Sequence, residues 1–471
     1  MKKNILFLML IVVNYAFTQI TLAPFSPISS PFNFGSEIDA FNNEIVCTAS
    51  NSFEMTMGKL FIFEKTGSGL VQTNSFQPLD GIPSDSYGKS ISINNDFIAI
   101  GSPFNDQVAT NSGAIYLYRK TNGVWAFFQK IIAFDGLAED YFGFKVKIYN
   151  NQLFVVATGD EPTGQNSSDN NGSVYVYNFD GTTWNFSQKL AIATTNQLGK
   201  LIDIENDKLL VSGGTISNSN TTIYTFLKNG NNWTFNTNLN PSSVNPVEIK
   251  SFSLNNGILF LIASDQNLIQ SIKNYTFNTT NWSFNSSINL PSTISDSRMT
   301  NIKVKNDVML IGATEYTLQV SRKSPIFYFK KVNSNWVLQQ TLYGNGNAGS
   351  DDYFGNSIAI SDNLVAIGAP SESSSLPYGK AYTFDTNLSI SSNEKLLNAI
   401  YPNPTNDVIY FNDELFNEVK TVELYQLDGK LIQQLNTSNK SISLKSFQSG
   451  IYVLKLTFSD QSFITKKIIK Q

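Results

Sequence analysis

The sequence predicts an all-β protein, with a seven-bladed β-propeller followed by a small antiparallel β-sandwich. Tryptophans recur at intervals of 59, 49, 49 and 54 residues, and short strands repeated about every 50 residues are typical of a ring of β-sheets. Aromatic residues make up 13% of the chain and charged residues only 15%, which favours strands over helices. The five tryptophans are Trp125, Trp184, Trp233, Trp282 and Trp336.

Residues 1–18 are expected to be a secretory signal peptide. Lys2 and Lys3 precede an apolar stretch over residues 5–13, which is too short to span a bilayer. Ala16 and Thr18 supply the small residues that precede a cleavage site. Since no other segment is long and apolar enough to cross a membrane, we expect an exported protein without a transmembrane segment.

Each repeat contains four predicted strands, which the second unit shows best. Tyr87-Gly88 opens its first strand, residues 98–103 form the second, and residues 114–118 form the third. Asn122-Gly123 is a tight hairpin turn, and Trp125 begins the fourth strand. In four repeats the tryptophan comes seven residues after an aromatic couplet; in the fifth, the couplet Tyr275/Phe277 precedes it by five.

The propeller is expected to cover residues 19–385, with its ends joined in one blade. The seventh unit stops after its third strand, near Phe384. Residues 19–24 resemble the fourth strands of other units and precede Phe34-Gly35 as a fourth strand should. They are therefore predicted to complete blade seven and to leave no open edge between the first and last blades.

Composition excludes several classes of function. The chain has no histidine, which removes the commonest general base and the commonest zinc ligand. Cys47 is its single cysteine and lies in an apolar run, so we expect a small buried side chain. A net charge of −4 supplies no basic field for nucleic acid.

The repeats contain the motifs Phe142-Gly143, Phe354-Gly355 and Gly368-Ala369-Pro370. With these motifs they resemble the FG-GAP family, known from the integrin α-subunit propeller, and the resemblance implies a seven-bladed propeller. Members of integrin type hold calcium in Asp-rich loops between the first two strands. Here that connection is as short as Asn94-Asn95, which cannot supply the six to eight oxygens that calcium prefers. We therefore expect no cofactor and no metal.

A polar linker over residues 386–395 leads to a module over residues 396–471 with alternating strands and an Asp428-Gly429 hairpin turn. The module opens with Tyr401, Pro402, Asn403 and Pro404 and has Gly450, Tyr452, Lys466 and Lys467 towards its end. With these residues, which form its sorting motif, the module resembles the type A C-terminal sorting domain of the Bacteroidetes type IX secretion system. The resemblance implies that the secretion machinery is its partner.

Loops between second and third strands are the candidate binding sites, because binding residues tend to lie on loops held by a rigid scaffold. The loop over residues 159–171 is the richest in oxygens and could bind a cation or sugar hydroxyls. The candidate ligand-binding residues are Asp106, Asp160, Glu161, Asp169 and Asn170. A plain solvated loop is the alternative interpretation.

Three functions remain open at this stage. The first is a secreted or surface-displayed propeller without enzymatic activity, which binds an extracellular glycan or protein in adhesion or capture. The second is a secreted enzyme acting on polysaccharide through two loop carboxylates, for which the candidate pairs are Asp135 with Asp140, Asp160 with Glu161, and Asp351 with Asp352. The third is a structural spacer with no specific ligand.

Overall fold

The chain divides into two compact units at Asp385. The computed structural model describes residues 23–27, 33–50, 57–67, 69–161, 171–192, 197–215, 218–241, 248–264, 270–288, 297–315, 324–344, 353–362, 364–370, 379–385, 400–411, 419–426, 430–435, 441–458 and 463–471. The expected signal peptide and linker lie outside these residues. Within them, no helix has the length and apolar character needed to cross a membrane.

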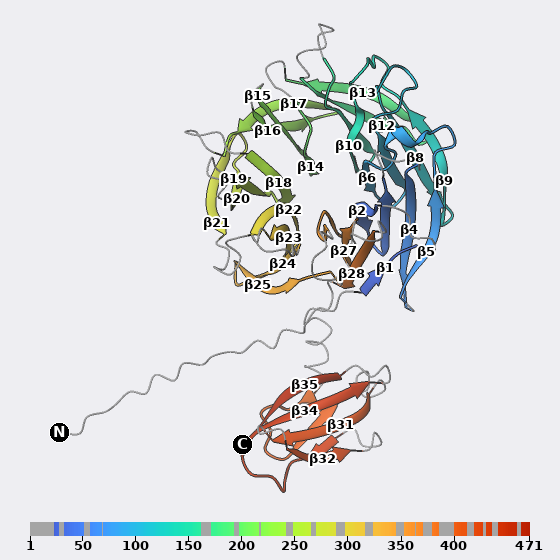
Figure 1. Cartoon of the computed structure of the whole chain (residues 1–471). Helices are drawn as coiled ribbons and strands as arrows, with labels where there is room; N and C mark the ends of the chain where they lie inside the picture. The colour runs from blue at the N-terminus through green and yellow to red at the C-terminus, as the bar shows by residue number, and fades with distance from the viewer. Residues whose placement is uncertain are drawn as a thin grey trace, which may run out of the picture. The chain divides into compact units, whose positions relative to one another are not determined.

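The first unit consists, over its described residues, of seven antiparallel four-stranded sheets arranged in a ring (Figure 1). These sheets are called blades 1 to 7 in chain order from Phe34. The innermost strands are β2 (Phe34–Phe41), β6 (Ser90–Ile93), β10 (Phe142–Tyr149), β14 (Ile202–Glu205), β18 (Glu248–Asn255), β22 (Ser297–Lys305) and β26 (Ser357–Ile360). The second strands are β3 (Glu44–Ala49), β7 (Phe97–Ser102), β11 (Gln152–Ala157), β15 (Lys208–Thr215), β19 (Ile258–Ser264), β23 (Val308–Glu315) and β27 (Leu364–Ala369).

The two outer positions of each blade complete the ring. The third strands are β4 (Lys59–Thr66), β8 (Ala114–Thr121), β12 (Ser173–Phe179), β16 (Asn218–Asn229), β20 (Gln270–Phe277), β24 (Ile326–Val332) and β28 (Lys380–Asp385). The outermost strands are β5 (Gly69–Phe76), β9 (Val124–Ile131), β13 (Trp184–Ala191), β17 (Asn232–Leu239), β21 (Trp282–Ile288), β25 (Asn335–Leu342) and, in blade 7, β1 (Ala23–Phe25). A short 3-10 helix, η1 (Pro83–Asp85), lies between blades 1 and 2.

The second strands explain why the sequence shows continuous apolar runs rather than alternation. Every residue of β3, β7, β11 and β27 is buried, because each blade is covered on both faces by its neighbours. Cys47 in β3 is fully buried, as predicted, and burial raises the pKa of its thiol. The core therefore lies between blades rather than inside any one of them.

Blade 7 combines the two ends of the first unit. β1 pairs antiparallel with β28, with Pro24 opposite Tyr382. The strand expected over residues 19–24 is described from Ala23 and extends to Phe25, whereas residues 19–22 lie outside the described residues. Phe25 also packs against Phe63 of blade 1, with ring centroids 4.9 Å apart. This pairing covers what would otherwise be an open edge of β28.

The tryptophans pack against the preceding blade. Ring centroids lie 5.1 Å apart for Trp184 and Phe97, 5.4 Å for Trp233 and Phe154, and 5.6 Å for Trp336 and Phe260. Trp125, Trp184 and Trp233 are at most 3% exposed. Large aromatic side chains at this position bury much apolar area between blades, which accounts for their recurrence.

Strand register corrects the spacing of the fifth repeat. Tyr118 lies opposite Phe127 in blade 2, two residues after the tryptophan. In blade 5 the residue at the equivalent position, opposite Phe284, is Tyr275. Tyr275 is therefore the second member of its couplet, Phe277 lies outside the couplet, and the spacing to Trp282 is seven residues, as in the other repeats.

Glycine permits close approach of neighbouring blades at the channel side. A Cβ atom on Gly101 of β7 would lie 1.9 Å from the carbonyl oxygen of Gly143 in the next blade. Gly143 itself has φ +95°, a conformation that side chains with a Cβ rarely adopt. The Phe-Gly pair thus marks the place where two backbones meet.

Glutamines in the outermost strands join consecutive blades. The Gln129 side chain accepts from the Trp184 backbone N–H at 3.0 Å and donates to the Trp184 carbonyl oxygen at 3.2 Å. Gln188 makes the same pair of bonds to Trp233, at 2.8 and 2.7 Å. Each amide replaces a missing strand neighbour, because it satisfies one donor and one acceptor of the next blade.

The second unit is a sandwich of two antiparallel sheets. One sheet has the order β29 (Ile400–Tyr401), β30 (Val408–Phe411) and β33 (Ser441–Ser443). The other has the order β32 (Leu431–Leu435), β31 (Val419–Gln426), β34 (Gly450–Phe458) and β35 (Phe463–Lys470). Their inner faces share one apolar core that includes Ile409, Leu424 and Leu454, each fully buried.

Candidate functional site

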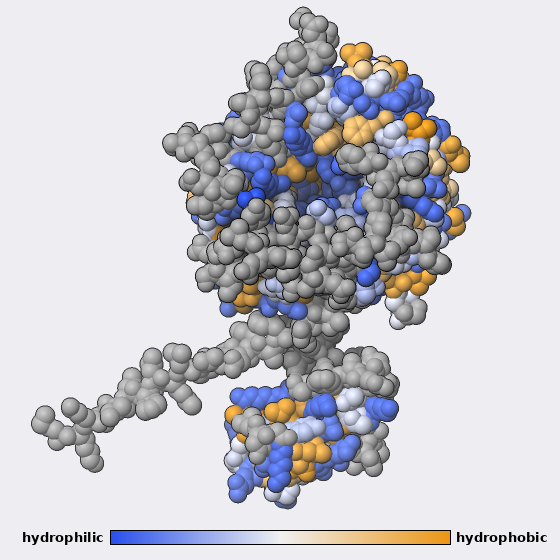
Figure 2. Space-filling view, viewed as in Figure 1, coloured by the Kyte–Doolittle hydropathy of each residue, from blue (hydrophilic) through white to orange (hydrophobic). Residues whose placement is uncertain are grey.

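The innermost strands of the first unit line an axial channel. Two cavities of about 460 and 560 Å³ lie along it and share Asp39, Lys147 and Lys303 as lining residues. Figure 2 shows that the ring is hollowed at its centre and that hydrophilic residues gather there. Since side chains alternate along a strand, every second residue of an innermost strand faces this space.

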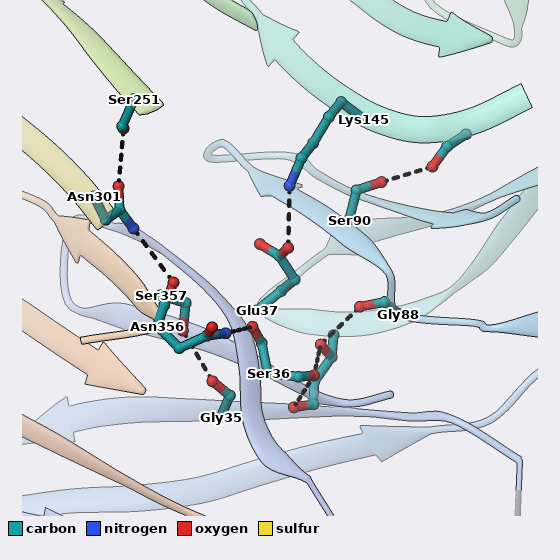
Figure 3. A network of polar contacts seen from close by, with 12 residues as sticks. Gly35, Ser36, Glu37, Gly88, Ser90, Lys145, Ser251, Asn301, Asn356 and Ser357 are labelled. Atoms are coloured by element: carbon teal, nitrogen blue, oxygen red, sulfur yellow. Dashed lines mark hydrogen bonds and ion pairs between the residues drawn. The ribbon is translucent and has the colours of Figure 1, made fainter. Parts of the chain in front are cut away.

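One end of the channel carries a ring of polar side chains, here called the mouth ring. It consists of Glu37, Ser90, Lys145, Ser251, Asn301 and Ser357. Lys145 Nζ forms an ion pair with Glu37 Oε1 at 3.1 Å, and Ser90 Oγ donates to the Gly143 carbonyl oxygen at 2.8 Å (Figure 3). These contacts hold the side chains of blades 1 to 3 in place.

The other side of the mouth ring is held in the same way. Asn301 Oδ1 lies 3.2 Å from Ser251 Oγ, and Ser357 Oγ donates to the Gly35 carbonyl oxygen at 2.9 Å (Figure 3). The neighbouring Asn356 side chain donates to the Ser36 carbonyl oxygen at 3.1 Å. The contacts therefore run from blade 5 through blades 6 and 7 to blade 1.

Deeper in the channel lies a second ring, the middle ring. Its members are Asp39, Ser92, Lys147, Asp203, Ser253, Lys303 and Ala359. Four of them accept a backbone N–H from the next blade: Asp39 from Ile93 at 3.0 Å, Ser92 from Ile148 at 3.1 Å, Asp203 from Leu254 at 2.8 Å and Ser253 from Val304 at 3.1 Å. Innermost strands are edge strands with unpaired donors, so these side chains stabilise the ring.

Lys147 and Lys303 depart from this pattern, because an ammonium cannot accept a hydrogen bond. Lys147 Nζ lies 4.0 Å from Asp203 Oδ1. Burial lowers the pKa of Lys147, but the carboxylates of Asp39 and Asp203 outweigh it and raise that pKa overall. Burial also lowers the pKa of Lys303 and the nearby Lys147 ammonium lowers it further, while the carboxylates of Asp203 and Asp39 offset these effects only in part.

The loop residues predicted from the sequence lie elsewhere. Asp106 is exposed in the loop after β7, and its Oδ1 accepts from the Asn111 backbone N–H at 2.8 Å. Asp160 is only 2% exposed, so its side chain does not face solvent from the loop as expected. Glu161 is partly buried, and Asp169 and Asn170 lie outside the described residues.

Asp160 belongs to a locked cluster within blade 3 and the loop before it. Tyr175 donates to Asp160 and to Asp135, at 2.8 Å in both cases, and Lys189 Nζ lies 2.8 Å from each carboxylate. Burial and the two carboxylates raise the pKa of Tyr175. These bonds occupy the oxygens that were considered for ligand binding or for acid–base catalysis.

The same cluster recurs one blade earlier. Tyr116 donates to Asp80 at 3.0 Å, and Lys130 Nζ lies 2.6 Å from the same carboxylate. An aspartate in the loop between blades, a third-strand tyrosine and a fourth-strand lysine thus form a repeated structural element. Among the other catalytic candidates, Asp351 and Asp352 lie outside the described residues, and Asp140 is 2% exposed with its Oδ2 accepting from the Leu137 backbone N–H at 2.7 Å.

The described part of the chain contains no group of three or more metal-ligating side chains that could hold an ion. The turns that replace the family's calcium loops are two residues long in blades 1 and 3, at Asn42-Asn43 and Asn150-Asn151.

The sorting-motif residues surround β35 in the second unit. The Asn403 side chain donates to the Lys467 carbonyl oxygen at 2.7 Å and accepts from the Ile469 backbone N–H at 2.8 Å. Lys466 Nζ donates to the Ile400 carbonyl oxygen at 2.9 Å. Tyr401, Pro402, Pro404, Gly450 and Lys467 are exposed, whereas Tyr452 is 8% exposed and donates to the Gln448 carbonyl oxygen at 2.7 Å.

Sequence reasoning missed the channel residues, although a signal was present. Lys145 and Lys147 alternate with apolar residues directly after Phe142-Gly143, and Lys303 and Lys305 do the same in blade 6. Charged residues with period two beside a buried face indicate a second, polar face. In a propeller this face can only be the channel.

Comparison with known proteins gives two family matches. The FG-GAP repeat family matches residues 70–118, 125–177 and 336–384, and the secretion system C-terminal sorting domain matches residues 399–471. A solved structure described as the crystal structure of RRP9 WD40 repeats aligns with 77% of this chain and 100% of its own, at 10% identity and a TM-score of 0.48. None of the curated proteins compared with the chain matches it.

Proposed function

Because this chain is an FG-GAP repeat propeller with a type IX secretion sorting domain, we propose that it binds an extracellular glycan or protein after export and has no enzymatic activity. The sorting domain implies export to the cell surface or the medium. The binding site in this proposal is the mouth ring together with Tyr353 at its edge.

The observation that carries the proposal is the rigidity of the mouth ring. Its serine, asparagine, lysine and glutamate side chains are held by hydrogen bonds and an ion pair between blades (Figure 3). Polar groups that are already in place lose little conformational entropy when a ligand binds. A concave site with a few convergent polar groups is also the common form of a ligand pocket.

Tyr353 favours a sugar among the possible ligands. It lines the same cavity, and 53% of its surface is exposed. Tyrosine offers an apolar ring face and a polar hydroxyl, which suits the apolar face and the hydroxyls of a sugar ring. The adjacent serine and asparagine side chains can then exchange hydrogen bonds with the sugar hydroxyls.

The test is a glycan and matrix-protein array probed with the full chain, with and without EDTA. We expect a specific signal that EDTA does not change and that Tyr353→Ala lowers at least about tenfold, the equivalent of about 1.4 kcal/mol. The matched control is Phe127→Ala, which removes an aromatic side chain of similar exposure, 52%, from an outermost strand. A blank array, or equal signals from both variants, would contradict this site and favour the spacer interpretation.

A further inference from the structure

Lys303 is a channel lysine that forms no ion pair within the part of the chain that the structure describes. It lines both cavities and is partly buried in β22. Among the described residues, no carboxylate oxygen lies within 4.0 Å of its ammonium, whereas Lys145 is paired with Glu37 and Lys147 lies beside Asp203. A partly buried charge without an ion-pair partner is unfavourable, so an anion bound beside Lys303 would stabilise its ammonium.

The carboxylates nearest in the ring are already engaged. Asp39 accepts the backbone N–H groups of Ala40 and Ile93 at 2.9 and 3.0 Å. Asp203 accepts those of Ile204 and Leu254 at 3.0 and 2.8 Å. These four bonds fix both carboxylates against the walls, so neither can turn toward Lys303 without leaving donors unpaired.

The route from the mouth ring to Lys303 favours an anion. The cavity at this end is lined by Lys145, Lys147, Lys250 and Lys303 and by two carboxylates, Glu37 and Asp39; Lys250 is also paired with Glu248, at 2.6 Å. Cavities lined by an excess of one charge concentrate ligands of the opposite charge. The other cavity adds three carboxylates, Asp96, Asp203 and Glu205, and one lysine, Lys305, to the lining, so an anion that enters from the mouth ring meets net repulsion beyond the middle ring.

We infer that the channel binds a carboxylate at Lys303 and that an acidic sugar, such as a uronic acid, supplies it. This inference rests on the proposed function and names the ligand class for it. The carboxylate would accept a charge-assisted hydrogen bond from Lys303 Nζ. The sugar ring would occupy the cavity that Lys303 and Tyr353 both line. The two connected cavities, about 460 and 560 Å³, have the size of ordinary small-ligand pockets.

The test is isothermal titration calorimetry on the full chain with galacturonate and with galactose, which lacks the carboxylate. We expect galacturonate to bind and galactose to bind at least about tenfold more weakly, with Lys303→Met lowering galacturonate affinity by a similar factor. The matched control is Lys331→Met, which removes an exposed lysine of the same blade and should leave affinity within about twofold. A trimer of galacturonate separates the sources: tighter binding than the monosaccharide indicates a chain end, and equal binding indicates a free sugar acid.

Equal affinities for galactose and galacturonate, or unchanged galacturonate binding in Lys303→Met, would overturn the inference. Inorganic sulfate that binds as tightly as galacturonate would also overturn it, because any small anion would then suffice. If Lys303→Met does not fold, the thermal midpoint of the unaltered protein decides: galacturonate must raise it, and galactose must not. If the glycan array is blank but galacturonate binding depends on Lys303, only the proposed function is refuted. If the protein binds the array and Lys303→Met leaves that binding unchanged, only this inference is refuted.

Discussion

Replacing Glu44 by leucine removes a charged contact that joins blades 1 and 2. Glu44 is 9% exposed at the start of β3. Its Oε1 accepts from Trp125 Nε1 at 2.9 Å, and its Oε2 lies 2.8 Å from Lys120 Nζ. Leucine fills a similar volume but leaves both donors without an acceptor.

The expected loss follows from the burial of the two donors. Trp125 is 3% exposed, and a buried donor left unpaired costs about 1–3 kcal/mol. Lys120 keeps 27% of its side-chain surface exposed, so its ammonium can regain water and adds only about 0–1 kcal/mol. We expect Glu44→Leu to lower the free energy of unfolding by roughly 2–3 kcal/mol.

The assay is urea unfolding of the full chain followed by tryptophan fluorescence. The control is Glu64→Leu, because Glu64 lies opposite Glu44 in the β3–β4 pair but is exposed; its change should stay within about 0.5 kcal/mol. A loss below about 1 kcal/mol for Glu44→Leu with an unchanged m-value, or equal losses in both variants, would refute the reasoning. In the next blade pair, Phe97 stands where Glu44 would be, and the buried indole N–H of Trp184 has no acceptor. Packing alone can therefore hold a tryptophan at this position.

Three further predictions concern other parts of the chain. Burial raises the pKa of Asp140 to about 6, above its unfolded value of about 3.9. The free energy of unfolding should therefore fall as pH rises from about 4 through 6. Asp140→Asn should abolish this fall, as checked by thermal midpoints measured across that pH range. Gly101→Ala should lower the free energy of unfolding in urea by more than about 3 kcal/mol, because its Cβ would lie 1.9 Å from a carbonyl oxygen. A Cβ on Gly67 would meet no atom within 4 Å. A similar loss in Gly67→Ala would therefore contradict this explanation. Asn403→Ala should destabilise the sorting domain by about 1–3 kcal/mol, because two hydrogen bonds to β35 are lost. Hydrogen exchange of the β35 amides measures this change. Asn406 is exposed, so Asn406→Ala should leave that exchange unchanged.

The blade architecture could be predicted because its signals are local. A repeat of about 50 residues contains all four strands of a blade, except where β1 completes blade 7. The tryptophan recurs because several blade junctions pack alike: Trp184, Trp233 and Trp336 each contact an aromatic ring of the preceding blade. The register of the fifth repeat could not be predicted from the sequence. Phe277 was assigned to the second position of the couplet, whereas strand pairing places Tyr275 there.

The candidate site could be predicted only in part. Asp160 begins a loop rich in polar residues, which favoured an exposed ligand-binding role. Two residues that follow it by 13 and 15 positions, Ser173 and Tyr175, instead bond its carboxylate, together with Lys189. Local composition cannot show such contacts, since it records that a residue is polar but not which partners the strands bring to it.

The sequence by itself therefore determined the repeat, the class of fold and the sorting domain, because each depends on residues within one blade or one short module. Only the tertiary structure decided what faces the channel and what meets there. Asp39, Lys147, Asp203 and Lys303 come from blades 1, 3, 4 and 6, and only the closed ring brings them to one cavity. The ion pair of Lys147 and the position of Lys303 beside it follow from that closure rather than from any property of the individual strands.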